Sequence, residues 1–488
     1  MSRVTPLIIA CALFMENLDS TVIATALPGI AQSMGEDPLR LSLAMTSYML
    51  ALAVFLPVSG WAADRYGART VFASAIAVFM AGSIACGLSN GLAELVAARI
   101  LQGIGGAMMV PVGRLILLRT VPKDQLVTAM ARMTLPALIG PALGPLVGGA
   151  ITTYASWRWI FFINVPIGLV GIALVLALIP NLKEEQRDPF DSRGFLWSAI
   201  ALAAFMFGFE NVGRDLLPAT AVAILLAVAL LATLAYLRHA RRVVRPVLDP
   251  SLFRLPTYRA SVLGGTLFRI GNGAVPFLMP VMLQIGFGLT AFESGALTFA
   301  GAAGALTMKA LAGPILRRFG FRLVLTLNSL VSGAILASYG AFRPDTPHLV
   351  ILGALLVGGF FRSLQFTGMN TLSYAEVPQP MTSRANTLAS VMQQLSLSLG
   401  VAVGATALHL TTQWSGGALT PATFVPAFLT VGLMACASSL PFWRLAADAG
   451  DEISGHIGSP RPETHPETQH DAARSATVKA AALTDAAD

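Results

Sequence analysis

The segment GWAADRYGAR, residues 60–69, recurs later in the chain as GPILRRFGFR, residues 313–322. The copies align without a gap and share four residues: Gly60, Arg65, Gly67 and Arg69 in the first, and Gly313, Arg318, Gly320 and Arg322 in the second. Each copy is a short polar loop between two apolar stretches, at the same place in its half of the chain. Any tight turn between helices favours glycine and arginine, but an ungapped repeat at matching places predicts two halves related as parallel repeats.

The sequence on both sides of these loops is strongly apolar. Of the 488 residues, 55% are hydrophobic and 12% are charged, whereas a soluble domain has roughly 25% charged residues. A helix needs about 20 apolar residues to cross a hydrocarbon core of about 30 Å. Fourteen stretches meet this requirement: 5–31, 42–63, 71–89, 93–118, 129–153, 159–180, 193–211, 218–237, 257–284, 291–312, 321–341, 347–372, 385–410 and 422–444.

The order of these stretches predicts an all-α polytopic membrane protein with two six-helix bundles and two additional helices between them. We expect the first bundle in residues 1–181, the linker with its two helices in 182–245, and the second bundle in 246–445. Residues 446–488 are polar and without periodicity, which predicts a disordered cytoplasmic tail.

Lysine and arginine concentrate in every second loop along the whole chain. By the positive-inside rule these loops are cytoplasmic, so both termini are expected in the cytoplasm. The net charge of +7 does not indicate nucleic-acid binding, because the basic residues are not interleaved with aromatic ones on one face. The three cysteines show no CxxC spacing, so neither a disulfide framework nor a metal site is predicted.

Two acids, Glu16 and Asp19, lie inside the first apolar stretch, and Arg99 lies inside the fourth. Counted along the helices, Asp19 and Arg99 each lie about 9 Å below the outer surface. Charged residues inside a membrane usually pair and line water. We therefore expect the acids to meet Arg99 beside an aqueous cavity, where a carboxylate gains and loses a proton as water access alternates. A static ion pair between two helices is the alternative.

Two further segments have patterns that could serve a change between conformational states. In GPALGPLVGGA, residues 140–150, Gly140, Gly144 and Gly148 form one bare helix face, while Pro141 and Pro145 bend the helix. This pattern fits a seal or pivot between two states, and it equally fits ordinary helix packing.

In the repeated loop, Gly67 permits a tight reversal. Asp64 can pair with Arg65, with Arg69 or with a neighbouring helix, and such a pair could hold one transport state. Plain topology, with positive-inside charges and a turn, is the alternative for this loop.

The second half carries polar residues deep in its apolar stretches. We expect a substrate cavity formed by Arg269, Asn272, Arg362, Gln393 and Gln394, although packing alone could explain either glutamine. A further set falls near the outer ends of its spans and is expected at the interface: Glu210, Glu293 and His409.

At this point the segments LDSTVIATALP, GWAADRYGAR, RILQGIGGAMM and GPALGPLVGG resemble signatures of the major facilitator superfamily. With SWRWIFFINVPIG at 156–168 and fourteen spans, the chain is similar to the drug:proton antiporter branch of EmrB/QacA type, and especially to its MdtD-like members. The resemblance covers about residues 5–445.

The resemblance implies roles for several residues. Asp19 matches the span-one acid of the family and Arg99 its span-four arginine implicated in proton transfer. The antiporter motif of the family is matched by Gly140, Pro141, Gly144, Pro145, Gly148 and Gly149. Glu16 departs from the family pattern, because its position is usually neutral, and it could change the proton count or favour cationic substrates. The arginines of the expected cavity leave anionic or neutral substrates open.

We therefore expect a transporter of the bacterial inner membrane that exports small hydrophobic or amphipathic compounds in exchange for protons. The alternatives are an exporter or importer of one metabolite or organic anion, and a channel. No nucleophile–base set supports an enzyme, and the absence of GxxxxGK[ST] disfavours ATP-driven pumping. The proton gradient replaces any cofactor. A monomer is expected in the bilayer, and the need for a periplasmic adaptor stays open.

Overall fold

A computed structural model describes residues 5–120, 126–181, 190–212, 217–244, 246–378, 381–416 and 419–454. For residues 118, 126–132, 134–138, 453 and 454 it describes the backbone alone. All regular secondary structure in the described residues is helical. The expected all-α polytopic fold is thereby confirmed.

The first half runs from α1 to α8. Its helices are α1 (Thr5–Met34), α2 (Ser42–Phe55), α3 (Val58–Tyr66), α4 (Ala68–Leu88), α5 (Leu92–Thr120), α6 (Leu126–Tyr154), α7 (Trp159–Phe162) and α8 (Asn164–Leu178). The pair α2 and α3 forms one span bent by 56°. The bend falls at Pro57, which lies between the two helices, and proline is a common cause of such kinks.

Two further helices, α9 (Ser192–Glu210) and α10 (Ala219–Ala240), follow the first half. They pack against each other, and α9 also contacts α2 of the first half and α16 of the second. Of the residues in the most apolar 18-residue stretch of α10, only 17% are buried inside the protein. This helix therefore presents most of its surface to the bilayer.

The second half runs from η2 to α19. The short η2 (Pro250–Arg254) precedes its first span, Pro256–Gly286. That span consists of α11 (Pro256–Arg259), η3 (Ala260–Gly264), α12 (Gly265–Gly273), α13 (Val275–Val281) and η4 (Met282–Gly286). The later elements are α14 (Ala291–Ser338), η5 (Tyr339–Ala341), α15 (His348–Leu372), α16 (Thr382–Trp414), η7 (Pro421–Thr423), α17 (Phe424–Ala437), α18 (Ser439–Trp443) and α19 (Asp451–Ser454).

The number of spans depends on how broken helices are counted. By length and composition, 11 helices of the described residues could cross a membrane, or 12 with the bent pair. The segment Ala291–Ala341 has 51 residues and a non-helical break at Gly320, so it holds two crossings. Helix α6, with 29 residues, is long enough for another. Counted in this way, the described residues have room for the fourteen crossings expected from the sequence.

The two copies of the repeated loop share one backbone feature. Gly67 and Gly320 both have a positive φ, 94° and 71° respectively, at the point where one helix ends and the next begins. Side chains other than glycine rarely adopt this conformation. A Cβ atom on Gly67 would also lie 2.1 Å from Oδ1 of Asn181. The repeat detected in the sequence therefore encodes the same tight reversal twice.

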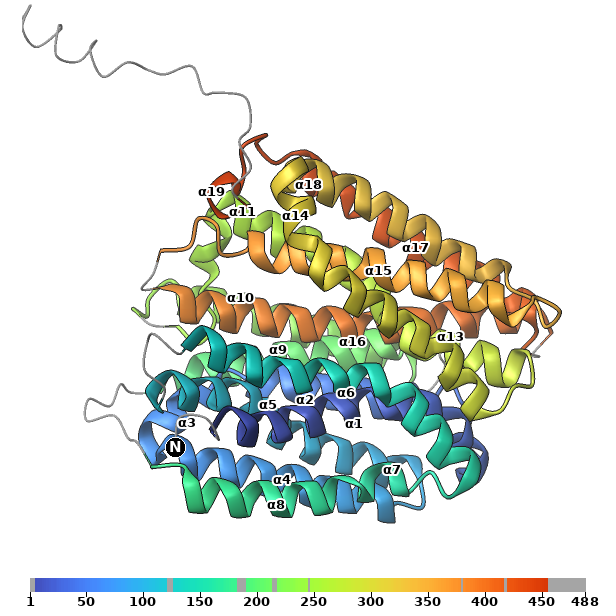
Figure 1. Ribbon diagram of the computed structural model, residues 1–488, viewed down its shortest axis with the longest axis horizontal. Helices are drawn as coiled ribbons and strands as arrows, with labels where there is room; N and C mark the ends of the chain where they lie inside the picture. Colours follow the sequence, from blue (N-terminus) through green and yellow to red (C-terminus); the bar gives the residue numbers. More distant parts are fainter. Residues whose placement is uncertain are drawn as a thin grey trace, which may run out of the picture.

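Figure 1 shows the first half, coloured blue to green, beside the second half, coloured light green to red, with α1 beginning at the same end as α19. The halves meet through α6 against α14 and through α2 against α16. At the end opposite the termini, the Phe292 amide donates to Thr153 Oγ1 at 3.0 Å. In the same interface, a Cβ on Gly149 would lie 2.3 Å from the Ala291 carbonyl oxygen, so the backbones touch.

The expected division at residues 181, 245 and 445 stays a prediction, since residues 182–189 and 245 lie outside the described part. Residues 446–454, assigned above to the disordered tail, are described and end in α19. They are held because Ala449 packs on the core of the second half and Gly450 lies against Phe321. The rest of the predicted tail, 455–488, lies outside the described residues.

Candidate functional site

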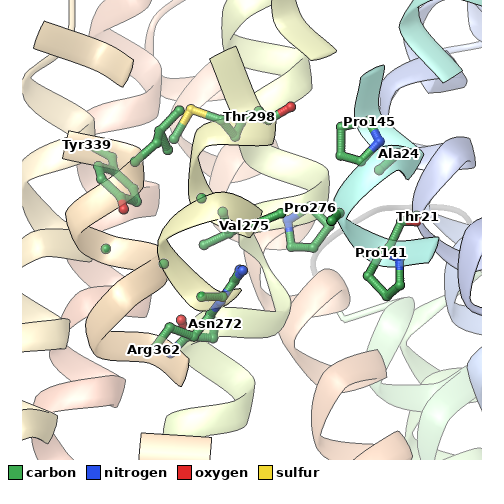
Figure 2. Close-up of a pocket in the computed structure, with 18 of the residues that line it drawn as sticks. Thr21, Ala24, Pro141, Pro145, Asn272, Val275, Pro276, Thr298, Tyr339 and Arg362 are labelled. Atoms are coloured by element: carbon green, nitrogen blue, oxygen red, sulfur yellow. The ribbon is translucent and has the colours of Figure 1, made fainter. Parts of the chain in front are cut away.

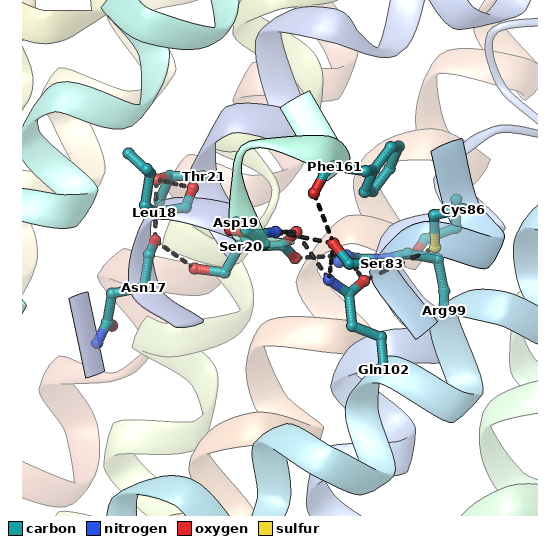
Figure 3. A network of polar contacts seen from close by, with 12 residues as sticks. Asn17, Leu18, Asp19, Ser20, Thr21, Ser83, Cys86, Arg99, Gln102 and Phe161 are labelled. Atoms are coloured by element: carbon teal, nitrogen blue, oxygen red, sulfur yellow. Dashed lines mark hydrogen bonds and ion pairs between the residues drawn. The ribbon is translucent and has the colours of Figure 1, made fainter. Parts of the chain in front are cut away.

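Asp19 on α1 and Arg99 on α5 form an ion pair inside the first half (Figure 3). Arg99 Nη1 lies 2.6 Å from Asp19 Oδ2, and each side chain is only 1% exposed. The two residues that the sequence placed at one depth are therefore in direct contact. Removing either partner would leave a buried charge uncompensated, which typically costs about 3–5 kcal/mol.

The other partners of Asp19 are also donors. Gln102 Nε2 and Asn164 Nδ2 donate to Asp19 Oδ1 at 2.8 and 2.9 Å. Both amides also donate to Ser83 Oγ, which in turn donates to the Phe161 carbonyl oxygen at 3.0 Å. Since an ionised carboxylate can only accept, this set of donors fits the charged form of Asp19.

Arg99 is held on all sides. Besides Asp19, it donates from Nη1 to Gln102 Oε1 at 2.6 Å and from Nε to the Ala44 carbonyl oxygen of α2 at 3.1 Å. Its guanidinium carbon lies 4.1 Å from the centre of the Tyr48 ring. The guanidinium therefore links α1, α2 and α5 and cannot turn away without breaking several contacts.

One expectation about this pair is wrong for the described conformation. The sequence predicted that the acids and Arg99 line an aqueous cavity, but the ion pair is enclosed by protein. Gln102 and Asn164 contact Asp19, and the Tyr48 ring lies against Arg99.

Glu16 lies nearly one turn before Asp19 and is 8% exposed. Its Oε2 has no hydrogen-bond partner among the described residues, and Glu16 is not part of the Asp19 network. Its role in proton coupling stays a prediction.

We expect Glu16→Gln to fold normally, because the buried Oε2 loses no hydrogen bond. If Glu16 carries a second proton, the substitution lowers the number of protons exchanged per substrate and slows export of cations several-fold. The measurement is the proton-to-substrate ratio in reconstituted vesicles. Glu94→Gln, an exposed acid on α5, is the control. An unchanged ratio would restrict proton coupling to Asp19.

The sequence analysis missed three members of the network: Ser83, Gln102 and Asn164. A signal for Gln102 was present, because RILQ at 99–102 recurs as RSLQ at 362–365. In the second half Gln365 Nε2 donates to Ser329 Oγ at 2.8 Å, as Gln102 does to Ser83 in the first.

In the second half, a neutral residue occupies the sequence position that corresponds to Asp19. Asp19 and Asn272 are separated by the same interval as the two loop copies. Arg362 corresponds to Arg99 through the RxxQ repeat, but its half provides asparagine where the first half provides aspartate. The second half therefore repeats the contact between glutamine and serine, whereas Asn272 Nδ2 donates to the Phe268 carbonyl oxygen of its own helix.

A cavity of about 250 Å³ lies between α1 and α6 of the first half and α12–α15 of the second (Figure 2). Its walls are mainly apolar, with Pro141 and Pro145 on one side. Asn272 and Arg362 contribute polar groups from the other side, and Lys309 adds a second cation. The described lining contains no acidic side chain, so the cavity is electropositive.

The remaining residues expected in the cavity lie outside its described lining. Arg269 is 3% exposed and donates from Nη2 to Asn370 Oδ1 at 3.1 Å, while its Nε and Nη1 have no partner in the described part. Gln393 and Gln394 are half-buried on α16 and do not line this cavity. The structure thus brings Asn272 and Arg362 together at a cavity and leaves the other three elsewhere.

Asp64 in the repeated loop pairs with a neighbouring helix. Arg119 Nη2 at the end of α5 lies 2.8 Å from Asp64 Oδ1. Arg65 instead lies over the Trp61 ring at 5.6 Å, and Arg69 Nη1 donates to the Ile179 carbonyl oxygen at 3.5 Å. Of the partners considered from the sequence, the neighbouring helix is the one observed.

The glycines of the predicted antiporter motif, which lie on α6, divide into two groups according to what they pack against. Cβ atoms on Gly144 and Gly148 would lie 2.0 and 2.6 Å from the hydroxyl oxygens of Thr21 and Thr25, so this face packs on α1. Gly140 packs there more loosely, at 3.0 Å from the Phe14 carbonyl oxygen. Gly149 faces the second half. The stripe therefore serves packing inside one half, and Gly149 serves the interface between halves.

Glu210 lies at the end of α9, where its place at the membrane interface stays a prediction, and it is 3% exposed because protein surrounds it. Its carboxylate accepts from Thr46 Oγ1 at 2.8 and 3.0 Å and from Ser42 Oγ at 3.4 Å. These hydroxyls flank Ala44, whose carbonyl holds Arg99. The end of α9 is buried because it packs directly on α2, which the sequence could not show.

Comparison with known proteins identifies the family. The sequence profile described as Major Facilitator Superfamily matches residues 9–401, with a second match over 262–469. The chain belongs to the major facilitator superfamily. Members of this family are secondary transporters that use no cofactor, so the chain is a multi-pass membrane transporter of small molecules and not an enzyme.

Two bacterial relatives of the chain within the superfamily carry the description "Putative multidrug resistance protein MdtD". The one from Klebsiella pneumoniae is 40% identical over 447 residues, which are 91% of this chain and 94% of the relative. The one from Cronobacter sakazakii is 42% identical over 396 residues, 81% of this chain and 84% of the relative.

Solved structures of the superfamily share the fold. A D-xylose–proton symporter superimposes with a TM-score of 0.65 at 16% identity, over 91% of this chain and 98% of that one. A peptide transporter in complex with sulfate gives a TM-score of 0.68 at 14% identity, over 93% and 96%.

Proposed function

We propose that the chain exports small hydrophobic or amphipathic compounds across the bacterial cytoplasmic membrane in exchange for protons, with both termini in the cytoplasm. The observation that carries this proposal is the buried Asp19–Arg99 pair. Arginine stays charged, so Asp19 is the member of the pair that can exchange a proton. The relatives described as multidrug resistance proteins support export of several compounds.

Alternating access would open and close the two ends of the molecule in turn. The contacts at the end opposite the termini, such as Phe292 with Thr153, support a state closed at that end. At the other end of the molecule, the Asp64–Arg119 pair and the tight reversals at Gly67 and Gly320 would help to hold the closed state of that end when the protein alternates. In this proposal Gly149 seals the two halves against each other, and Asp19 exchanges its proton when the seal opens.

The cavity supports an amphipathic substrate. Apolar walls with a few convergent polar groups are typical of small-molecule sites. Asn272 and Arg362 would orient a polar end of the substrate while Pro141, Pro145 and Met279 contact its apolar part.

Flux in energised everted vesicles tests the proposal. We expect substrate uptake into the vesicles together with dissipation of a pH gradient that a dye reports. Uptake without proton movement would overturn the proposed coupling, and movement in the opposite direction would indicate an importer.

A second candidate is an exporter of organic anions. The observation favouring it is that Arg362 and Lys309 line the cavity while its described lining offers no acid. A guanidinium binds carboxylates well because it offers several donors in a fixed geometry.

We expect Arg362→Gln to separate the two candidates. If Arg362 binds an anionic group, the variant raises the KM for anionic substrates roughly tenfold or more, because hydrogen bonds to charged groups contribute about 1.5–3 kcal/mol. Cationic substrates should be unaffected. The measurement is uptake of a panel of substrates of different charge, with the exposed Arg343→Gln as control. Equal effects on both classes would remove the case for anions.

A further inference from the structure

A second cavity, of about 740 Å³, lies where α10 ends and the second half begins. It adjoins the start of α11, at the end of the molecule where α1 begins (Figure 1). Three arginines line it: Arg241, which directly follows α10, Arg254 of η2 and Arg384 of α16. We call this site the arginine cavity.

The charges of the arginine cavity are not balanced. Its only acid in the described lining is Asp249, which lies 3.4 Å from Arg384 and also accepts from Ser251 N and Oγ at 3.1 and 2.6 Å. Arg241 and Arg254 are exposed, and their guanidinium groups form no ion pair or hydrogen bond with other described residues. Two guanidinium groups are therefore free to bind an anion.

An apolar track leads along α10 to these arginines. Leu230 and Leu234 are 60% and 51% exposed, and Leu237 lines the cavity. Leu230, Leu234 and Leu237 follow each other at helical spacing and share one face of α10, and Arg241, the helical C-cap residue, continues this face. Since α10 has little cover from other helices, this face meets the bilayer and ends at a positive charge.

We propose that the arginine cavity binds the phosphate headgroup of an anionic phospholipid whose acyl chains lie along the leucine face of α10. Guanidinium groups bind phosphate bidentately, and basic pockets beside membrane helices bind anionic headgroups. A soluble phosphate would use the arginines alone and leave the leucines exposed. The bound lipid joins α10 of the linker to η2 and α16 of the second half.

The experiment is lipid titration of the purified full-length protein in detergent, followed by native mass spectrometry. Dioleoyl phosphatidylglycerol is the probe, and dioleoyl phosphatidylcholine is the neutral reference. We expect wild type to prefer phosphatidylglycerol, and Arg241→Gln with Arg254→Gln to weaken its binding roughly tenfold or more. Arg242→Gln is the matched control, since Arg242 is exposed on the same turn but does not line the cavity.

Competition with inorganic phosphate and glycerol phosphate separates a lipid site from a phosphate site. If inorganic phosphate or glycerol phosphate displaced the lipid at a concentration equal to that of the lipid, the assignment to a lipid would be overturned. Unchanged lipid binding by the double variant would also overturn it. If the glutamine variants fail to fold, Leu234→Gln replaces them. This variant is expected to bind phosphatidylglycerol more weakly than wild type but inorganic phosphate equally well. Binding of the lipid as tight as that of wild type would contradict the proposal.

Discussion

Replacement of Asp19 by asparagine is expected to reduce proton-driven export to the level of vesicles that lack the protein. Asparagine cannot exchange a proton, and its amide would face the donors of Gln102, Asn164 and Arg99. The loss should be confined to coupling. Substrate exchange without a gradient should continue, because the cavity does not include Asp19 in its described lining.

The structure also shows how to judge this result. Arg99 loses its counter-charge in the variant, so stability must be measured beside transport, for example by thermal unfolding. Asp19→Glu keeps the carboxylate and should recover part of the coupling, while Asp345→Asn, in an exposed loop, should behave as wild type. A folded Asp19→Asn protein with normal proton-driven export would remove the proposed mechanism.

Replacement of Gly149 by alanine is expected to shift the protein toward the state that is open at the end opposite the termini. The new Cβ would lie 2.3 Å from the Ala291 carbonyl oxygen. This oxygen belongs to the backbone, so it cannot move aside by a rotamer change as a flexible side chain could. Overpacking of this kind typically costs about 1–3 kcal/mol, which changes the population ratio of two states roughly 5- to 150-fold. Transport should fall because the closed state forms less often.

Spin labels on Tyr154 and Leu349 would measure the shift as a distance distribution. These side chains are 75% and 78% exposed, one in each half, and the native cysteines would be replaced first. Gly60→Ala is the control, because a Cβ on Gly60 would meet nothing within 4 Å. Distances that do not change in the Gly149 variant would argue against a seal at this position.

Much of the candidate site could be predicted because membrane geometry restricts it. The bilayer fixes the length of each span, so the depth of Asp19 and Arg99 follows from counting residues. The rarity of charges at such depth then makes contact between them the simplest expectation. Gln102 and Asn164 gave no such signal, since amides are common in packing contacts, and their place in the network depends on how α5 and α8 rotate against α1.

The sequence by itself determined the helices, the two reversals at Gly67 and Gly320, and the presence of opposite charges at one depth. These follow from local properties: apolar length, the backbone freedom of glycine and the low polarity of the membrane. Only the tertiary structure decided that Glu210 is buried against Thr46, that Arg362 lines the cavity while Arg269 does not, and that Gly149 faces the other half. Each of these depends on the rotation of one helix against its neighbours, which packing between distant segments sets and local sequence does not.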